Sequence, residues 1–185
     1  MISANQLTIL RMVFVPIFVF LVLDRQLGGA LAVFLLAGIT DLLDGFIARR
    51  FGQKTPIGTL LDPAADKLLL TASFILLSQG ALGLTVTIPL WLTITVIGRD
   101  VLLVISIVII NLAMGPHLFP PSVYGKATTA IQLLTVLVVL VLNYLEISLP
   151  WLLYGFYLAF ALTIISGTHY LARGMRLVSY SQEKV

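Results

Sequence analysis

Cysteine is missing from this chain, and charged side chains are few. The 185 residues include no Cys and two His, and only 10% of them are Asp, Glu, Lys or Arg. Without cysteine there is no disulfide, no thiolate metal ligand and no thiol nucleophile. A soluble domain has roughly 25% charged residues. This chain is 59% hydrophobic, and its few charged residues cannot cover the surface of a soluble protein of this size. A soluble enzyme and a disordered chain are therefore excluded, and a polytopic membrane protein is indicated.

Six apolar stretches are each long enough to cross a bilayer, which takes about 20 residues. They predict an all-α integral membrane protein with six transmembrane helices, near Leu7–Leu23, Gly28–Ala48, Ile57–Ser78, Leu84–Leu112, Tyr124–Tyr144 and Leu149–Leu171. The remainder is sufficient only for short loops, so we expect residues 1–185 to form a single transmembrane domain. No small-x-small cleavage site follows the first stretch, so we expect it to be a span and not a cleaved signal peptide.

Basic residues are shared unevenly between the two sides that these spans define. Arg49, Arg50 and Lys54 lie in the loop after the second span, and further Lys and Arg lie near the fifth span and the C-terminal tail. The opposite side carries only Arg25 among the basic residues. The positive-inside rule therefore places both termini and the loop after the second span in the cytoplasm. The same rule accounts for the net charge of +3, and we expect no nucleic-acid partner.

Four of the eight acidic residues are clustered, at Asp41, Asp44, Asp62 and Asp66, each on or beside an apolar span. A charge at the centre of a span costs roughly 2.5–3.5 kcal/mol, and like charges repel one another. Asp41 and Asp44 are spaced i, i+3, and the other two i, i+4, so each pair shares a helix face. The short loop between the two helices makes them antiparallel neighbours, so we expect both pairs to meet at the cytoplasmic end.

Four carboxylates facing one cavity form a metal site made of oxygen ligands. Hard oxygen ligands without His or Cys favour Mg²⁺, Mn²⁺ or Ca²⁺. Four acids suffice for two such ions, which can clamp phosphate oxygens during an in-line displacement. Arg49 adjoins this site and is able to hold a phosphate through two hydrogen bonds. The cluster therefore predicts a metal–phosphate site.

A structural role is the alternative for these acids. Asp62 could cap the N-terminus of a helix whose first residue is Pro63, while Asp41 and Asp44 form a polar edge. The sequence Thr55-Pro56 offers an earlier helix start, which we favour. The structural role is the weaker explanation, because it accounts for one carboxylate pair but not for both.

A family resemblance rests on these same residues. The segments Asp41-Leu-Leu-Asp44-Gly45-Phe-Ile-Ala48-Arg49 and Gly58-Thr-Leu-Leu-Asp62-Pro-Ala-Ala-Asp66 match D-x2-D-G-x2-A-R-x8-G-x3-D-x3-D at every fixed position. In them the chain resembles the CDP-alcohol phosphotransferase family. Asn5-Gln-Leu-Thr8-Ile-Leu-Arg11 is similar to the N-terminal motif of bacterial phosphatidylglycerophosphate synthases. With the six-span layout, the resemblance extends along most of the chain.

The resemblance implies an enzyme that displaces CMP from a CDP-linked lipid with the hydroxyl of an acceptor alcohol. It implies two divalent cations, Mg²⁺ or Mn²⁺: one held by Asp41, Asp44 and Asp62, the other by Asp41, Asp62 and Asp66. Asp66 would also be the catalytic general base, which a hydroxyl nucleophile needs at neutral pH, while the cations neutralise charge on the pyrophosphate. The CDP group would be bound by Gly45, Ala48, Arg49 and Gly58.

A looser set of polar residues is a candidate acceptor site. Arg99 and Asp100 lie within the fourth predicted span, so they must pair or line a cavity. With Lys126 and Arg173, Arg99 could bind a phosphate on the acceptor. The alternatives are that Lys126 and Arg173 are cytoplasmic anchors and that Arg99 forms an internal ion pair with a neighbouring carboxylate.

Two departures from the family pattern bear on the acceptor. Phosphatidylglycerophosphate synthases usually have Arg-Glu and Gly-Lys-x-Lys-Thr where this chain has Arg99-Asp100 and Gly125-Lys126-Ala127-Thr128-Thr129. The single lysine and Arg-Asp also resemble eukaryotic-type cardiolipin synthases. We expect the phosphatidyl group of CDP-diacylglycerol to pass to glycerol 3-phosphate, releasing CMP; the alternative acceptor is phosphatidylglycerol, in a cardiolipin synthase reaction. The resemblance further implies a homodimer in the bacterial inner membrane, among membrane lipids, with the active site facing the cytoplasm.

Two other functional classes compete with this prediction. A transporter or channel would spread its acidic residues through the depth of the membrane and favour inverted repeats. A structural scaffold would not require the Gly-x-x-Ala-Arg spacing. The clustering of four acids at one end of two neighbouring helices favours the enzyme.

Overall fold

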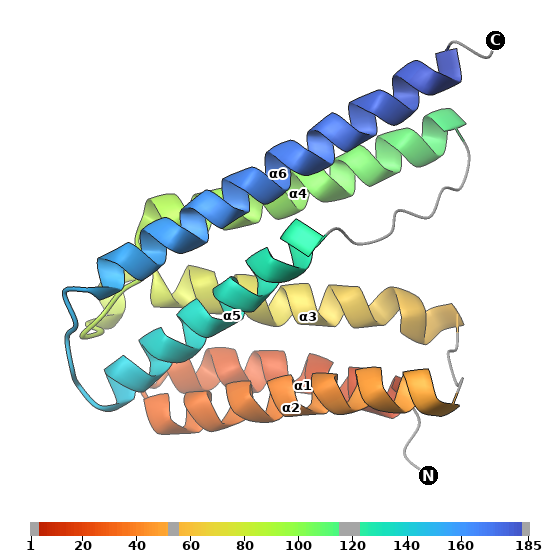
Figure 1. Ribbon diagram of the computed structural model, residues 1–185. Helices are drawn as coiled ribbons and strands as arrows, with labels where there is room; N and C mark the ends of the chain where they lie inside the picture. Colours follow the sequence, from red (N-terminus) through yellow and green to blue (C-terminus); the bar gives the residue numbers. More distant parts are fainter. Residues whose placement is uncertain (1–3, 52–55, 115–122, 183–185) are drawn as a thin grey trace. The chain divides into compact units, whose positions relative to one another are not determined.

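The computed structural model describes residues 4–51, 56–114 and 123–182, with side chains described at residues 10, 12–41, 67–106 and 124–172. The described chain is helical and contains no strand (Figure 1). Its elements are α1 (Ala4–Leu23), α2 (Leu27–Phe51), α3 (Pro56–Leu77), the short 3₁₀ helix η1 (Gly80–Leu82), α4 (Leu90–Met114), α5 (Val123–Tyr144) and α6 (Leu152–Gln182). The all-α class and a helix at each of the six expected positions are confirmed.

The fourth helix begins later than the apolar run suggests. We expected it from Leu84, but α4 begins at Leu90. The backbone of Val86 is instead bonded to the side chain of Asn143, which accepts from its N–H at 3.0 Å and donates to its carbonyl at 2.8 Å. A backbone whose polar groups are satisfied in this way has no need of helical bonds. The helix then starts directly after Pro89, which has no N–H to contribute to an earlier turn.

The sixth helix is displaced at both ends from its predicted span. It begins at Leu152, not Leu149, because Pro150 lies in the intervening turn. It continues to Gln182, well beyond the predicted end at Leu171. The apolar run sets the length of a membrane span, but the helix itself continues into the polar tail.

The helices divide between two compact units, and α5 contributes to both. One unit comprises residues 1–87 and 136–149, and the other comprises residues 88–135 and 150–185. The first unit therefore holds α1, α2, α3 and the second half of α5. The second holds α4, α6 and the first half of α5. That the whole chain is a single transmembrane domain stays a prediction.

In the first unit, α1 is the shared neighbour of α2 and α3. The rings of Phe18 and Phe34, both buried, lie 6.1 Å apart between α1 and α2. Gly28 permits a close approach of α5 to α2, because a Cβ there would lie 2.8 Å from the Tyr144 ring. This unit carries the helices with the predicted carboxylates.

The second unit has α4 and α6 side by side, running in the same direction. Trp91 near the start of α4 stacks on Tyr157 of α6, with 5.5 Å between ring centroids. Further along both helices, the side chain of Arg99 reaches Ser166. Paired contacts that advance together along both sequences require parallel helices. The first half of α5 runs antiparallel to α6, because Tyr124 contacts His169 whereas Thr128, four residues later, contacts Leu162.

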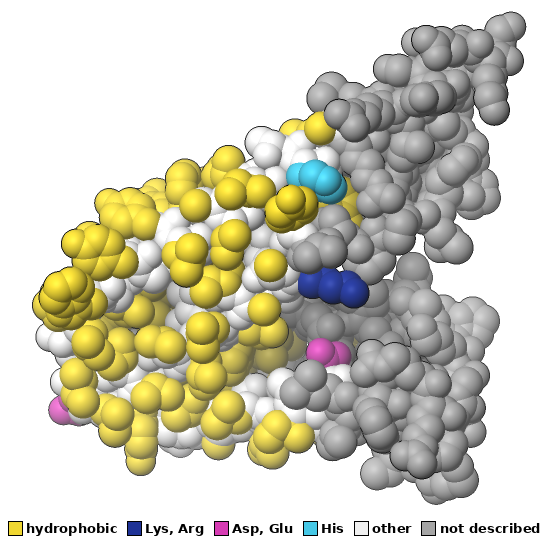
Figure 2. Space-filling view, viewed as in Figure 1, with side chains coloured by type: hydrophobic (Ala, Val, Ile, Leu, Met, Phe, Trp, Pro, Cys, Tyr) yellow, Lys and Arg dark blue, Asp and Glu magenta, His cyan; other side chains and the backbone are white. Residues whose placement is uncertain are grey.

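The distribution of polarity suits a lipid environment. Hydrophobic side chains are spread over much of the described surface visible in Figure 2. Among the exposed hydrophobic residues, Phe20 and Trp151 are 64% and 74% exposed. Polar side chains such as Gln132 and Ser166 are fully buried. Large exposed apolar surfaces are rare on soluble monomers, and small or hydroxyl-bearing residues are typical of helix contacts inside membranes.

Two described helical segments are long and apolar enough to cross a membrane, Tyr124–Tyr144 and Leu152–Ala172. Three shorter apolar segments lie at Met12–Leu23, Leu27–Asp41 and Lys67–Leu77. Six spans with cytoplasmic termini remain a prediction.

Candidate functional site

The four predicted carboxylates lie on two consecutive helices, Asp41 and Asp44 on α2 and Asp62 and Asp66 on α3. Because α3 begins at Pro56, the alternative in which Asp62 caps a helix that starts at Pro63 is wrong, and the earlier start is confirmed. Asp62 and Asp66 therefore lie inside one helix, four residues apart and on one face.

The positions of the four acids along their helices correspond. Asp44 lies seven residues before the end of α2, and Asp62 lies six residues after the start of α3, about 10 Å and 9 Å along the helices. Asp41 and Asp66 are each ten residues from the same ends, about 15 Å along. Only residues 52–55 connect the two ends. Counted from residues 52–55, the four acids therefore fall at two corresponding positions along the two helices.

The side chain of Asp41 is half-buried. The other predicted residues of this motif lie on α2 or α3, but their side chains are outside the described residues; they are Asp44, Gly45, Ala48, Arg49, Gly58, Asp62 and Asp66. Among the described side chains there is no group of three or more His, Cys, Asp or Glu able to hold a metal ion. The donor set of the motif, carboxylates alone, suits Mg²⁺ or Mn²⁺, and the metal site stays a prediction.

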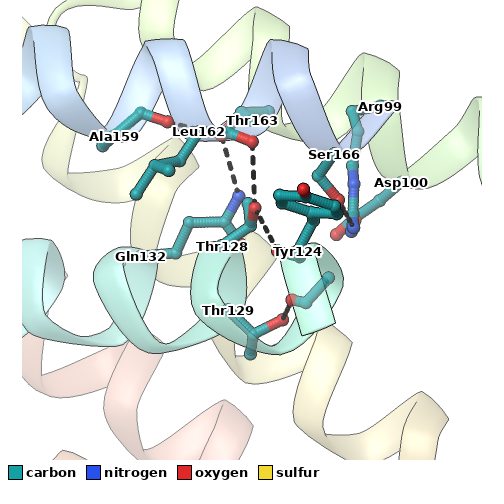
Figure 3. A network of polar contacts seen from close by, with 11 residues as sticks. Arg99, Asp100, Tyr124, Thr128, Thr129, Gln132, Ala159, Leu162, Thr163 and Ser166 are labelled. Atoms are coloured by element: carbon teal, nitrogen blue, oxygen red, sulfur yellow. Dashed lines mark hydrogen bonds and ion pairs between the residues drawn. The ribbon is translucent and has the colours of Figure 1, made fainter. Parts of the chain in front are cut away.

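Arg99 is the best defined of the predicted acceptor residues, and it is 7% exposed. Its Nη1 donates to Oδ1 of Asp100 at 2.7 Å, and its Nη2 donates to the Ser166 hydroxyl on α6 at 2.7 Å (Figure 3). The stem of Arg99 packs against α6 at Gly167, where its Cγ lies 3.5 Å from the position a Cβ would take, an ordinary van der Waals distance. The internal ion pair considered from the sequence is therefore present, and Asp100 matches the charge of the guanidinium.

One nitrogen of Arg99 makes no hydrogen bond within the described chain. Its Nε is buried and has no hydrogen-bond partner among the described residues. A buried donor without a partner costs about 1–3 kcal/mol, so Nε offsets part of the stability that the two bonds of the same guanidinium contribute.

Lys126 and Thr128 lie near the start of α5 in different surroundings. Lys126 is exposed. Thr128 is fully buried, with its hydroxyl 2.8 Å from the carbonyl of Tyr124 and 3.0 Å from that of Leu162 on α6 (Figure 3). Its single proton is shared between these two acceptors. The position at which the resemblance would place a second lysine is thus a contact between α5 and α6.

A second polar contact joins α5 to α6 one turn further on. Gln132 Nε2 donates to the Thr163 hydroxyl at 3.3 Å, and that hydroxyl donates to the Ala159 carbonyl at 2.7 Å. The remaining predicted acceptor residue, Arg173, lies on α6 with its side chain outside the described residues.

Sequence reasoning missed Ser166 and Thr163 as parts of this network. The available signal was their i, i+3 spacing within an apolar helix, which places two hydroxyls on one face. Hydroxyls at such positions are typical of hydrogen bonds between membrane helices. Their partners on α4 and α5 are distant in sequence and could not be assigned from it.

Residues 1–166 match the sequence profile of the family described as CDP-alcohol phosphatidyltransferase. The match covers most of the chain, which therefore belongs to this family. The resemblance inferred from the acidic motif is confirmed.

Relatives of two kinds are similar to this chain. A "Cardiolipin synthase (CMP-forming)" of Rattus norvegicus is 36% identical over 148 residues, covering 71% of this chain and 47% of that protein. A "CDP-diacylglycerol--glycerol-3-phosphate 3-phosphatidyltransferase" of Aquifex aeolicus is 31% identical over 177 residues, covering 94% and 96%. A "Probable phosphatidylglycerophosphate synthase" of Mycobacterium tuberculosis is 35% identical over 185 residues, covering 94% and 81%. The chain spans about half the length of the mammalian cardiolipin synthases that it matches.

Proposed function

We propose that this chain is a CDP-diacylglycerol-dependent phosphatidyltransferase, which passes a phosphatidyl group to the hydroxyl of a glycerol-bearing acceptor and releases CMP. The observation that carries the proposal is the complete acidic motif on α2 and α3, with its four aspartates at corresponding distances from the helix ends that residues 52–55 join. Family membership supports the same chemistry. A transporter or a structural scaffold would not need this motif.

The roles follow from the motif. Asp41, Asp44 and Asp62 would hold one Mg²⁺ or Mn²⁺, and Asp41, Asp62 and Asp66 a second. When bound, these cations neutralise negative charge on the pyrophosphate and stabilise CMP as the leaving group. Asp66 accepts the proton of the attacking hydroxyl. The CDP group is bound by Gly45, Ala48, Arg49 and Gly58.

Glycerol 3-phosphate is the acceptor that the sequence favours, and relatives whose match covers 94% of this chain carry the corresponding names. Its phosphate is a dianion and would be bound by Arg99, Lys126 and Arg173.

Phosphatidylglycerol is the second candidate, and a specific observation favours it. Asp100 matches the charge of Arg99 at 2.7 Å, and the second lysine of the synthase pattern is here the buried Thr128. Both features lower the positive charge available to a dianion. The phosphodiester of phosphatidylglycerol carries one negative charge, so its binding needs less positive charge than that of a dianion.

The enzyme would act as a homodimer in the bacterial inner membrane, with six spans per chain and its active site facing the cytoplasm. In that arrangement, the acyl chains of CDP-diacylglycerol stay in the bilayer. The nucleotide is then released to the cytoplasm.

The test is CMP release by the purified chain in detergent, with CDP-diacylglycerol and Mg²⁺ or Mn²⁺. Glycerol 3-phosphate, phosphatidylglycerol, inositol phosphate and serine are supplied in parallel. CMP release with one of the first two supports the proposal and names the acceptor. Absence of release with all four from the folded protein contradicts it.

A further inference from the structure

Four aromatic side chains that carry a polar group lie together where α4 and α6 begin, all within the second unit. We call them the aromatic band: Trp91 on α4, Trp151 directly before α6, and Tyr154 and Tyr157 on α6. The Trp91 ring stacks on that of Tyr157, with 5.5 Å between centroids. The rings of Trp151 and Tyr154 lie 5.9 Å apart. The band includes both tryptophans of the chain.

The aromatic band turns much of its surface outward. Trp151, Tyr154 and Tyr157 each expose more than half of their surface, and Trp91 is exposed as well. Within the described chain, no hydrogen bond uses an indole N–H or a phenol O–H of the band. A ring with one polar group at its edge suits a boundary between an apolar and a polar medium, because each part of the side chain then has the surroundings it favours.

The surface that follows the band is aliphatic and uncharged. The helix α4 has no Asp, Glu, Lys or Arg before Arg99, and residues 150–172 have none at all. Side chains such as Ile94 on α4 and Ile165 on α6 are exposed there. Proteins that cross a bilayer have Trp and Tyr at its interfaces and apolar side chains in its core. The order of residues along α4 and α6 is therefore that of an interface followed by a hydrocarbon core.

The distance from the band to the first basic residue of α6 matches the thickness of a bilayer. Arg173 follows Tyr154 by 19 residues, about 29 Å along the helix, and a hydrocarbon core is about 30 Å thick. Basic residues that flank a span favour the cytoplasmic side. The band, at the other end of the same span, therefore belongs at the opposite interface.

We infer that the aromatic band binds the lipid surface at the interface away from the cytoplasm, where its indole N–H and phenol O–H groups donate to ester and phosphate oxygens of phospholipids. The inference rests on the membrane location proposed above and does not depend on the reaction. It also sets a depth for Arg99, which follows Trp91 by eight residues, about 12 Å along α4. A charge at that depth is costly, and Asp100 matches it within the protein.

The ring contacts place the two tryptophans at different depths. Trp151 contacts Tyr154, whereas Trp91 contacts a tyrosine three residues later on α6, about 4.5 Å further along the helix. Trp151 should therefore lie nearer the water, and Trp91 nearer the acyl chains.

Tryptophan fluorescence of the full chain in phospholipid vesicles measures these depths. Because the chain has two tryptophans, Trp91→Phe leaves only Trp151, and Trp151→Phe leaves only Trp91. The vesicles contain phospholipids brominated either near the headgroup or near the ends of the acyl chains, since bromine quenches a nearby indole. The control is Ile165→Trp in a chain whose native tryptophans are both replaced by Phe. Ile165 is exposed on α6, eight residues beyond Tyr157 and about 12 Å further along.

Bromines near the headgroup should quench Trp91 and Trp151 at least about twofold more strongly than bromines at the chain ends, and Ile165→Trp should show the reverse. Iodide in the water should quench Trp151 more strongly than Trp91. Stronger quenching of either native tryptophan from the chain ends would overturn the inference, because that residue then lies in the core. Quenching by iodide alone, or the same bromine profile at all three positions, would overturn it as well.

A cysteine label tests the side of the membrane. The chain has no Cys, so Ser148→Cys, at an exposed position three residues before Trp151, introduces a unique thiol. In intact bacterial cells that produce this variant, a membrane-impermeant maleimide should label it. The control Ser181→Cys, in the basic tail, should be labelled only after the cells are opened. Labelling of Ser148→Cys only in opened cells would overturn the placement of the band.

Failure of this inference and failure of the proposed function give different results. Tryptophans that lie at the interface in a folded chain without CMP release would retain the aromatic band and refute the enzyme. CMP release by a chain whose tryptophans are quenched from the chain ends would retain the enzyme and refute the band.

Discussion

Replacing Ser166 with alanine tests whether α6 holds Arg99 in place. The Ser166 hydroxyl accepts from Arg99 Nη2 at 2.7 Å, both side chains are buried, and Nε of the same guanidinium is already without a partner. Hydrogen bonds to charged groups contribute about 1.5–3 kcal/mol in soluble proteins. Bonds between membrane helices average about 0.6 and reach about 1.7 kcal/mol. For this charge-assisted bond we expect a loss of about 1–2 kcal/mol, between these two ranges.

The assay is thermal unfolding of the purified protein in detergent, followed by helical circular dichroism. One kcal/mol shifts Tm by roughly 2–4 °C for a chain of this size, so Ser166→Ala should lower Tm by about 2–8 °C. The control is Ser73→Ala, since Ser73 is equally buried but donates only to the Leu69 carbonyl of its own helix. Its Tm should stay within about 2 °C of the wild type. Equal shifts in the two variants, or no shift for Ser166→Ala, would refute the reasoning.

Three further outcomes are expected. Asn143→Ala leaves the N–H and carbonyl of Val86 without their partner and should cost about 1–3 kcal/mol, measured as a lower Tm; an unchanged Tm would contradict that bracing role. Thr128→Val removes an uncharged contact between α5 and α6 and should cost about 0.6 kcal/mol, so its Tm should fall less than that of Ser166→Ala; a larger fall would reverse our ranking of the two bonds. Chelation with EDTA should abolish CMP release, and added Mg²⁺ or Mn²⁺ should restore it; undiminished release in EDTA would exclude the two-cation mechanism.

The sequence was sufficient where a signal is local. Thr55-Pro56 predicted the start of α3 because proline is favoured in the first helical turn, and α3 begins at Pro56. The corresponding positions of the four aspartates along α2 and α3 then follow from the rise per residue of a helix. The acidic motif also identified the family. Its fixed spacings of three and four residues place each pair of acids on one helix face, so this signal too is local.

The sequence was insufficient where the partner is remote. The start of α4 was misplaced because Asn143, 57 residues further on, bonds to Val86. The ion pair of Arg99 with the adjacent Asp100 could be considered as an alternative, but its bond to Ser166, 67 residues away, could not. Hydropathy shows that such polar groups are inside a span without showing which of them meet.

The central claim is that the acidic motif performs metal-dependent phosphatidyl transfer, and Asp66→Asn tests it most directly. CMP release from CDP-diacylglycerol, with Mg²⁺ or Mn²⁺ and each acceptor, is compared between the wild type and this variant, with Tm measured on both. We expect CMP release to fall at least a hundredfold, the scale of losing a general base, while Tm changes little. Two results would contradict the claim. One is CMP release by Asp66→Asn equal to that of the wild type, and the other is no CMP release by a folded wild-type protein.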